Sequence, residues 1–166
     1  MKTIKNILVP TDLSNLSLVA MDYAISLAMM YKAKIYMLHV IDHDPVLAFP
    51  TVDRHFQTVP RDARKRARKS LKHWISDRWK SGGAITEVVR RGDPSKEIVG
   101  FAREKGIELI VMATHGRSGI AHFIMGSVAE KVVRYAPVPV LTIKPKEMQR
   151  RFSDENISTT TKCAKD

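Results

Sequence analysis

The stretch at residues 112–128, MATHGRSGIAHFIMGSV, holds the residue types and spacing that best suit ligand chemistry. An apolar, strand-like run precedes it and a segment with helical apolar spacing follows it. Because glycine has no Cβ, the backbone N–H groups at Gly116 and Gly126 could approach a phosphate closely. Ser127 would add a hydroxyl, and the N-terminus of the following helix would direct its N–H groups to the same place.

The residues alone leave two interpretations of this stretch open. The glycines form a phosphate cradle, or they only shape turns while Ser127 caps its helix in an S-x-x-E box with Glu130. Known phosphate loops do not decide between them. The chain has no G-x-x-x-x-G-K-[ST] run, and the first strand-like segment is followed by PTDLS rather than a glycine-rich turn.

Other candidate constellations are weaker. Residue types that bind metals gather after the second strand-like run, but their spacing matches no standard site: His39, Asp42, His43, Asp44 and His55. We therefore expect no dedicated metal site, and magnesium would arrive with a nucleotide. His115 and Ser127 do not form a recognisable nucleophile–base pair without an orienting acid, so we predict no catalytic residues.

Short apolar runs alternate with helical stretches along the chain. The strand-like runs are residues 3–10, 34–41, 84–91, 107–113 and 138–144, and the helical stretches are 14–32, 61 to about 81, 93 to about 106, and 127–136. Asp93, followed by Pro94, is a typical helix start. This alternation predicts an α/β fold, a parallel doubly wound sheet with helices on both faces, whose ligands bind beyond the carboxyl ends of the strands.

Much of the excess of basic over acidic residues lies in one segment. Formal net charge is +11, and residues 61–80 hold nine basic residues against two acidic ones. We interpret this segment as an amphipathic helix with a solvated cationic face; the alternative is a nucleic-acid footprint, which would need support such as aromatics for stacking. Trp74 does not supply it, because its helical spacing with Ala67 and Leu71 places it in the core. The sequence therefore favours a solvated helix over a nucleic-acid partner, and the role of this segment stays open.

Length and composition set the domain organisation and location. The 166 residues suit one domain at 1–146, followed by a polar segment at 147–166 whose composition predicts a disordered tail. Apolar runs are too short to span a bilayer, the N-terminal segment lacks a signal-peptide core, and Cys163 has no partner cysteine in the sequence. We expect a cytoplasmic protein without membrane association.

The glycine stretch resembles the nucleotide-binding loop of the universal stress protein family, whose ATP-binding members carry G-x-x-G, nine residues, then G-[ST]. Gly116 matches the second glycine, and Gly126 and Ser127 match the closing pair. Ala113 stands where the first glycine would be; alanine fits if its φ is negative. The segments ILVPTDLS, LHVID, GDPSKEIV, ELIVMATHG and GSVAEKVVRYAPVPVLTIK also look like family segments, in the family's order.

This resemblance implies a flavodoxin-like sheet of five strands in the order 3-2-1-4-5 that binds ATP or AMP. It implies that the neighbourhood of Asp12 contacts the adenine and ribose and that the Val40 backbone recognises the edge of the adenine. It also implies that Met112 and Ala113 flank the sugar, and that the phosphates are held by Gly116, Gly126, Ser127 and Val128. The implied nucleotide-binding residues are Pro10, Thr11, Asp12, Val40, Met112, Ala113, His115, Gly116, Arg117, Gly126, Ser127 and Val128. Asp12 could instead serve only as the start signal of the first helix.

The resemblance favours a regulatory, stress-related nucleotide-binding protein that forms a homodimer through strand 138–144. Two other classes stay open. One is a slow ATPase or nucleotidyl transferase, although the chain lacks the H-x-G-H and S-G-G-x-D-S runs of such transferases. The other is an interaction module without a ligand, which Ala113 keeps open. We expect a binding protein, not an enzyme.

Overall fold

The computed structural model describes residues 3–42, 61–78, 84–115 and 125–144. The elements in chain order are β1 (Asn6–Thr11), α1 (Asn15–Tyr31), β2 (Lys34–Ile41), α2 (Arg61–Arg78), β3 (Ile85–Arg91), α3 (Pro94–Glu104), β4 (Leu109–Ala113), α4 (Ser127–Tyr135) and β5 (Val140–Ile143). The predicted tail at 147–166 lies outside the described residues, as do Gly116 and Arg117.

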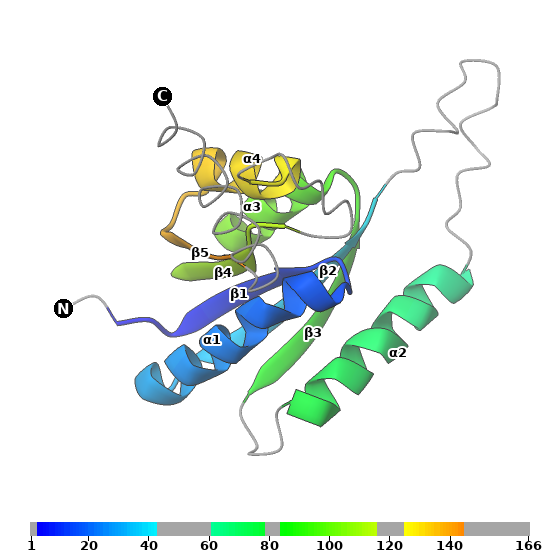
Figure 1. Ribbon diagram of the computed structural model, residues 1–166, viewed down its shortest axis with the longest axis horizontal. Helices are drawn as coiled ribbons and strands as arrows, with labels where there is room; N and C mark the ends of the chain where they lie inside the picture. Colours follow the sequence, from blue (N-terminus) through cyan, green and yellow to red (C-terminus); the bar gives the residue numbers. More distant parts are fainter. Residues whose placement is uncertain (1–2, 43–60, 79–83, 116–124, 145–166) are drawn as a thin grey trace, which may run out of the picture.

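The five strands form one parallel sheet in the order β3-β2-β1-β4-β5. Helices α1 and α2 cover one face of this sheet, and α3 and α4 cover the other (Figure 1). The predicted α/β doubly wound architecture and its strand order are therefore confirmed. The winding direction reverses between β1 and β4, because β2 and β3 are added on one side of β1 and β4 and β5 on the other.

Alternate residues of the central strands supply two separate hydrophobic clusters, one on each face. Ile7 and Val9 of β1 point to the α1 and α2 side, where Leu71 of α2 is fully buried. Leu8 points to the opposite side and packs with Phe101 of α3. Strand β4 is buried along its whole length, as expected for a strand covered on both faces.

Several elements begin later than their apolar pattern predicts. The pattern predicts a first strand from residue 3, but β1 begins at Asn6, which is paired with Lys34 at the start of β2. Strand β4 begins at Leu109 rather than 107, where its register with Ile7 of β1 begins; the Glu108 N–H donates to the Asn6 carbonyl, and the Glu108 carboxylate accepts from the N–H groups of Lys5 and Asn6. Pairing partners, not hydrophobicity, set these boundaries.

Helix α3 starts as predicted. Asp93 is its N-cap, and its carboxylate accepts a hydrogen bond from the Lys96 N–H at 3.0 Å, with Pro94 in the first turn. None of the described helices is both long enough and apolar enough to cross a membrane.

Candidate functional site

The carboxyl ends of β1 and β4 meet where the winding direction reverses. In open α/β sheets this crevice is the usual place for a ligand. It brings together the end of β1 at Thr11 and Asp12, the end of β4 at Ala113, and the start of α4 at Ser127. Segments from opposite halves of the chain therefore converge at one edge of the sheet.

The turn from β1 into α1 is held by a compact hydrogen-bond network. The Thr11 hydroxyl accepts from the Leu13 N–H at 3.0 Å and lies 2.8 Å from the Ser17 hydroxyl oxygen. Asp12 Oδ1 accepts from the N–H and the hydroxyl of Ser14, at 3.0 and 2.6 Å. Leu13 has a φ of 64°, an unusual conformation for a leucine that the surrounding bonds hold in place.

Asp12 is not the helix cap. Ser14 is the N-cap of α1, and its side chain accepts from the Ser17 N–H at 3.2 Å. Asp12 acts one step earlier by bonding Ser14 in an Asx turn. Asp12 therefore does not cap the helix itself. It shapes the turn between the end of β1 and the helix start.

His39 links the end of β2 to the same turn. Its Nδ1 lies 2.9 Å from the Thr11 carbonyl oxygen. Because a carbonyl can only accept, Nδ1 must carry the proton and donate it. The next residue, Val40, is half-buried and packs against the cluster beneath α3 and α4. His39 is therefore engaged in fixing the site's backbone; no group of three potential metal ligands occurs within the described residues.

The loop between β4 and α4 is closed at its base by backbone contact. The Gly126 N–H donates to the Thr114 carbonyl at 2.8 Å, and the Thr114 N–H donates to the Ile143 carbonyl of β5 at 2.9 Å. The Thr114 hydroxyl also lies 2.9 Å from His115 Nδ1, and both residues are buried. These bonds hold the end of β4 against β5 and against the start of α4.

Gly126 leaves little room for a side chain facing Thr114. A Cβ on Gly126 would lie 3.2 Å from the Thr114 carbonyl oxygen and 3.9 Å from the His115 Cα. The φ of Gly126 is −68°, so backbone freedom is not the reason for a glycine there. Close approach of the two backbones is the reason.

The predicted capping box at the start of α4 is wrong. The N-cap is Gly126, which makes no side-chain cap hydrogen bond, and Ser127 is the first residue of the helix, with an exposed side chain. Glu130 instead pairs with Arg134 one turn later, at 3.4 Å. The Gly126 N–H bonds the Thr114 carbonyl, and the N-cap is Gly126, one residue before the Ser127 that the S-x-x-E pattern predicts.

The other predicted residues take positions consistent with a backbone role. Met112 and Ala113 are 5% and 7% exposed, so their side chains belong to the core. Among the described non-glycine residues only Leu13 and Lys32 have positive φ, so Ala113 meets the condition under which alanine can replace glycine. Pro10 lies within β1, and Val128 is half-buried in the first turn of α4.

Sequence reasoning missed four residues that position this site: Ser14, Ser17, Thr114 and the ring of His39 in its bond to Thr11. A partial signal was present, because D-x-S after a strand is typical of an Asx turn before a helix. Nothing in the sequence indicated that Thr114 would bond Gly126, since that contact depends on how the loop closes.

The fold has counterparts in known proteins. The family model described as the universal stress protein family matches residues 3–144. A universal stress protein of Methanocaldococcus jannaschii is 35% identical over 146 residues, which cover 84% of this chain and 82% of that protein.

Solved structures of other proteins have the same fold. The structure reported for the hypothetical protein MJ0577 superposes with a TM-score of 0.75 at 25% identity and covers 87% of this chain and 99% of that one. A universal stress protein from Archaeoglobus fulgidus in complex with dAMP has the same fold, with a TM-score of 0.63 at 24% identity, and the match covers 86% of this chain and 100% of that one. The match along residues 3–144 shows that this chain belongs to the universal stress protein family.

Proposed function

We propose that this protein binds an adenine nucleotide, ATP or AMP, and acts as a regulatory binding protein rather than an enzyme. The observation that carries the proposal is the start of α4. Its N-cap is a glycine without a side-chain bond, placed at the carboxyl ends of β1 and β4.

A helix N-terminus leaves its first N–H groups without intrahelical partners, and a capping side chain usually satisfies one of them. In α4 the cap residue Gly126 has no side chain to do so. The helix dipole also favours negative charge at this end. Phosphate oxygens would supply the acceptors that the cap lacks, and the Ser127 hydroxyl is exposed beside them.

The other half of the crevice suits a nucleoside. The network around Asp12 holds the end of β1 in one conformation, and His39 holds the Thr11 carbonyl toward β2. A rigid backbone edge beside Val40 can recognise the edge of an adenine by hydrogen bonds without needing charged side chains. The dAMP bound by the Archaeoglobus fulgidus relative supports an adenine nucleotide as the ligand class, as an analogy at the level of the fold.

Binding without turnover is the form of the function that we favour. The sequence lacks the H-x-G-H and S-G-G-x-D-S runs of nucleotidyl transferases. The described groups at the start of α4 are backbone N–H groups and a serine hydroxyl, which stabilise a bound anion. Magnesium would be held through the phosphates of the nucleotide rather than by a protein cage.

Isothermal titration with ATP, AMP and adenosine tests the proposal. We expect ATP to bind with a dissociation constant in the micromolar range, roughly −7 to −9 kcal/mol, and adenosine to bind more weakly. Protein purified without added nucleotide and then heat-denatured should release material that absorbs as adenine. Absence of binding to all three ligands would favour the interaction module without a ligand, and sustained phosphate release from ATP would favour the ATPase.

We also propose that two copies associate through β5. This strand is at the edge of the sheet, and Leu141 is 37% exposed on it. An apolar edge strand carries backbone N–H and C=O groups that can pair with a second chain. Antiparallel pairing of two β5 strands about a two-fold axis would give an isologous contact.

A further inference from the structure

The strongest charged surface among the described residues lies on α2, away from the proposed nucleotide site. Six exposed cations occupy nine consecutive positions of this helix: Arg64, Lys65, Arg66, Arg68, Lys69 and Lys72. Asp62 is the one carboxylate among the described α2 side chains. The ion pairs among the described residues lie on β3, α3 and α4, so none of them neutralises this face.

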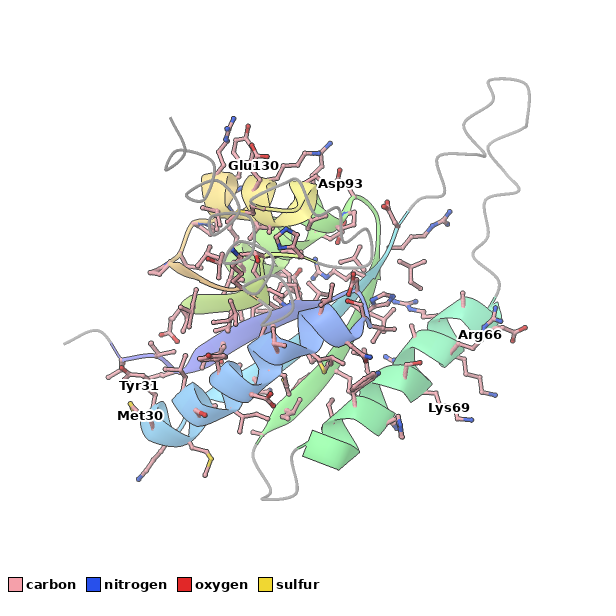
Figure 2. All side chains as sticks on the ribbon, in the orientation of Figure 1. Met30, Tyr31, Arg66, Lys69, Asp93 and Glu130 are labelled. Atoms are coloured by element: carbon pink, nitrogen blue, oxygen red, sulfur yellow. The ribbon has the colours of Figure 1, made fainter. Side chains whose placement is uncertain are left out.

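The position of α2 leaves this face open. The helix packs against β2 and β3 through a narrow stripe that includes Ala67 and Leu71, which are 7% and 0% exposed. It lies at the β3 edge of the molecule, well separated from α1 (Figure 1). Arg66 and Lys69 point outward from the fold (Figure 2).

The cations wrap around the helix rather than lie in one plane. At about 100° per residue they span an arc of roughly 200°, over an axial length of about 12 Å. Lys65, Lys69 and Lys72 form the central ridge. Arg64 and Arg68 lie on one flank, and Arg66 lies on the other.

We propose that this face of α2 binds duplex nucleic acid through its phosphate backbone, without sequence preference. A groove of the duplex is bordered by two phosphate ridges, and the DNA major groove is about as wide as an α-helix. Cations on both flanks and on the ridge of a helix match that shape. Half of the six are arginines, whose guanidinium groups bind phosphates in a bidentate manner.

Two other anionic partners fit less well. A flat bilayer surface would meet only the central ridge, and the described part of α2 has no apolar residue to insert, because its apolar stripe is buried against the sheet. An acidic protein surface would need apolar or aromatic anchors beside the charges. The large exposed hydrophobic side chains of the described residues lie on α1, α4 and β5, not on α2.

Stacking on single strands is not part of the proposal. Trp74 is half-buried and packs against the core, so it offers no free ring to a base. Phosphate contacts to a duplex require no aromatic side chain. Helix α2 packs against β2 and β3, so duplex binding by this face can be tested separately from adenine-nucleotide binding at β1 and β4.

Fluorescence anisotropy with a labelled duplex of about 20 base pairs and arbitrary sequence tests this surface. The full chain should bind it with a dissociation constant in the micromolar range at low salt, and the logarithm of the association constant should fall with the logarithm of salt concentration with a slope of about −3 to −5. A second duplex of unrelated sequence should bind equally well. No binding at low salt, or a slope near zero, would overturn the proposal.

Matched variants distinguish binding by this face of α2 from a general effect of the protein's net charge. Lys65→Gln/Lys69→Gln/Lys72→Gln should raise the dissociation constant about tenfold or more and reduce the slope by about 2 to 3. Lys96→Gln/Arg103→Gln/Lys105→Gln removes the same charge from the α3 side and should bind within about twofold of the wild type. Lys65→Arg/Lys69→Arg/Lys72→Arg should retain binding.

Equal losses in the two glutamine variants would show a non-specific charge effect and contradict the proposal. Circular dichroism and thermal unfolding of each variant verify that the fold is kept. Vesicles that contain phosphatidylserine provide the competing surface. Tighter binding to these vesicles than to the duplex would replace the nucleic acid by a membrane as the partner.

Discussion

At the scale of one residue, both the fold and the proposed ligand require the backbone at Gly126 to be free of a side chain. Its N–H bonds the Thr114 carbonyl, and a Cβ would crowd that same oxygen at 3.2 Å. A methyl group would push the loop closure apart by a few tenths of an ångström. That shift moves the N-terminus of α4, where we place the phosphates.

We therefore expect Gly126→Ala to weaken ATP binding about tenfold, or about 1.4 kcal/mol, while the protein stays folded. Gly100→Ala is the matched control, because Gly100 lies in α3 and has open space where the new methyl group would lie. It should raise the free energy of unfolding by about 0.5 to 1 kcal/mol and leave ATP affinity unchanged. Isothermal titration and thermal unfolding check both variants, and normal ATP binding by Gly126→Ala would refute the assignment of the cradle.

Ser127 is the second residue whose role the structure redefines. Because it is not the N-cap, Ser127→Ala should change the free energy of unfolding by less than about 0.5 kcal/mol, compared with about 1 kcal/mol for the loss of a true cap. It should weaken ATP more than adenosine, since only ATP has phosphates near the hydroxyl. Titrations with both ligands decide this point, and equal losses for the two would remove Ser127 from the phosphate site.

These two residues also show where sequence reasoning ends. Residue types were enough to predict that Gly126 and Ser127 lie together at a helix start behind a buried strand. They were not enough to predict which residue caps the helix. That depends on the bond from Gly126 to Thr114, which forms only when the loop closes in three dimensions.

At the scale of elements, α3 illustrates a start that the sequence predicts fully. The N-cap Asp93 accepts hydrogen bonds from the Ser95 hydroxyl and the Lys96 N–H. The bond from Ser95, followed by that from Lys96, lowers the pKa of the Asp93 carboxyl below its ordinary value. Local chemistry alone fixes this cap, so local sequence could identify it.

We expect Asp93→Ala to lower the free energy of unfolding by about 1 kcal/mol at neutral pH. Asp93→Ser is the control that keeps a capping oxygen and removes the charge. Because the pKa is lowered in the folded state, the charge contributes stability above the unfolded pKa, and this contribution is lost as the pH falls through the folded pKa, below roughly pH 4. Denaturant unfolding of both variants between neutral and acidic pH measures it; a wild-type advantage over Asp93→Ser that grows on acidification would contradict this assignment.

Element types were more predictable than element ends for a general reason. Apolar patterning reports which residues are buried, and β4 follows it, because its unbroken apolar run is buried along its whole length. Strand ends depend on partners far away in the chain. The Ile110 N–H donates to the Pro139 carbonyl just before β5 begins, and the Glu108 N–H donates to the Asn6 carbonyl of β1 just before β4 begins.

At the scale of the whole molecule, the open edge of β5 carries the proposed dimer contact. The carbonyl groups of Pro139 and Ile143 accept from β4 and from Thr114 just beyond it, so by the alternation of a parallel strand the backbone groups of Val140 and Thr142 face the open edge. Ile143 packs into the cluster beneath α1 and α2, whereas Leu141 is exposed. Leu141 and the edge N–H of Thr142 are therefore the groups to test, and Ile143 belongs to the core.

We expect the wild type to have about twice the 18.8 kDa mass of one chain in light scattering at tens of micromolar. Thr142→Pro removes an N–H from the open edge without removing a bond to β4, so it should yield a folded monomer. Leu141→Lys should also be monomeric, because a buried unpaired charge at the contact disfavours association. Tyr23→Lys, at a 54% exposed position on α1, is the matched control and should remain a dimer. A monomeric wild type, or a Thr142→Pro variant that still dimerises, would exclude pairing through β5.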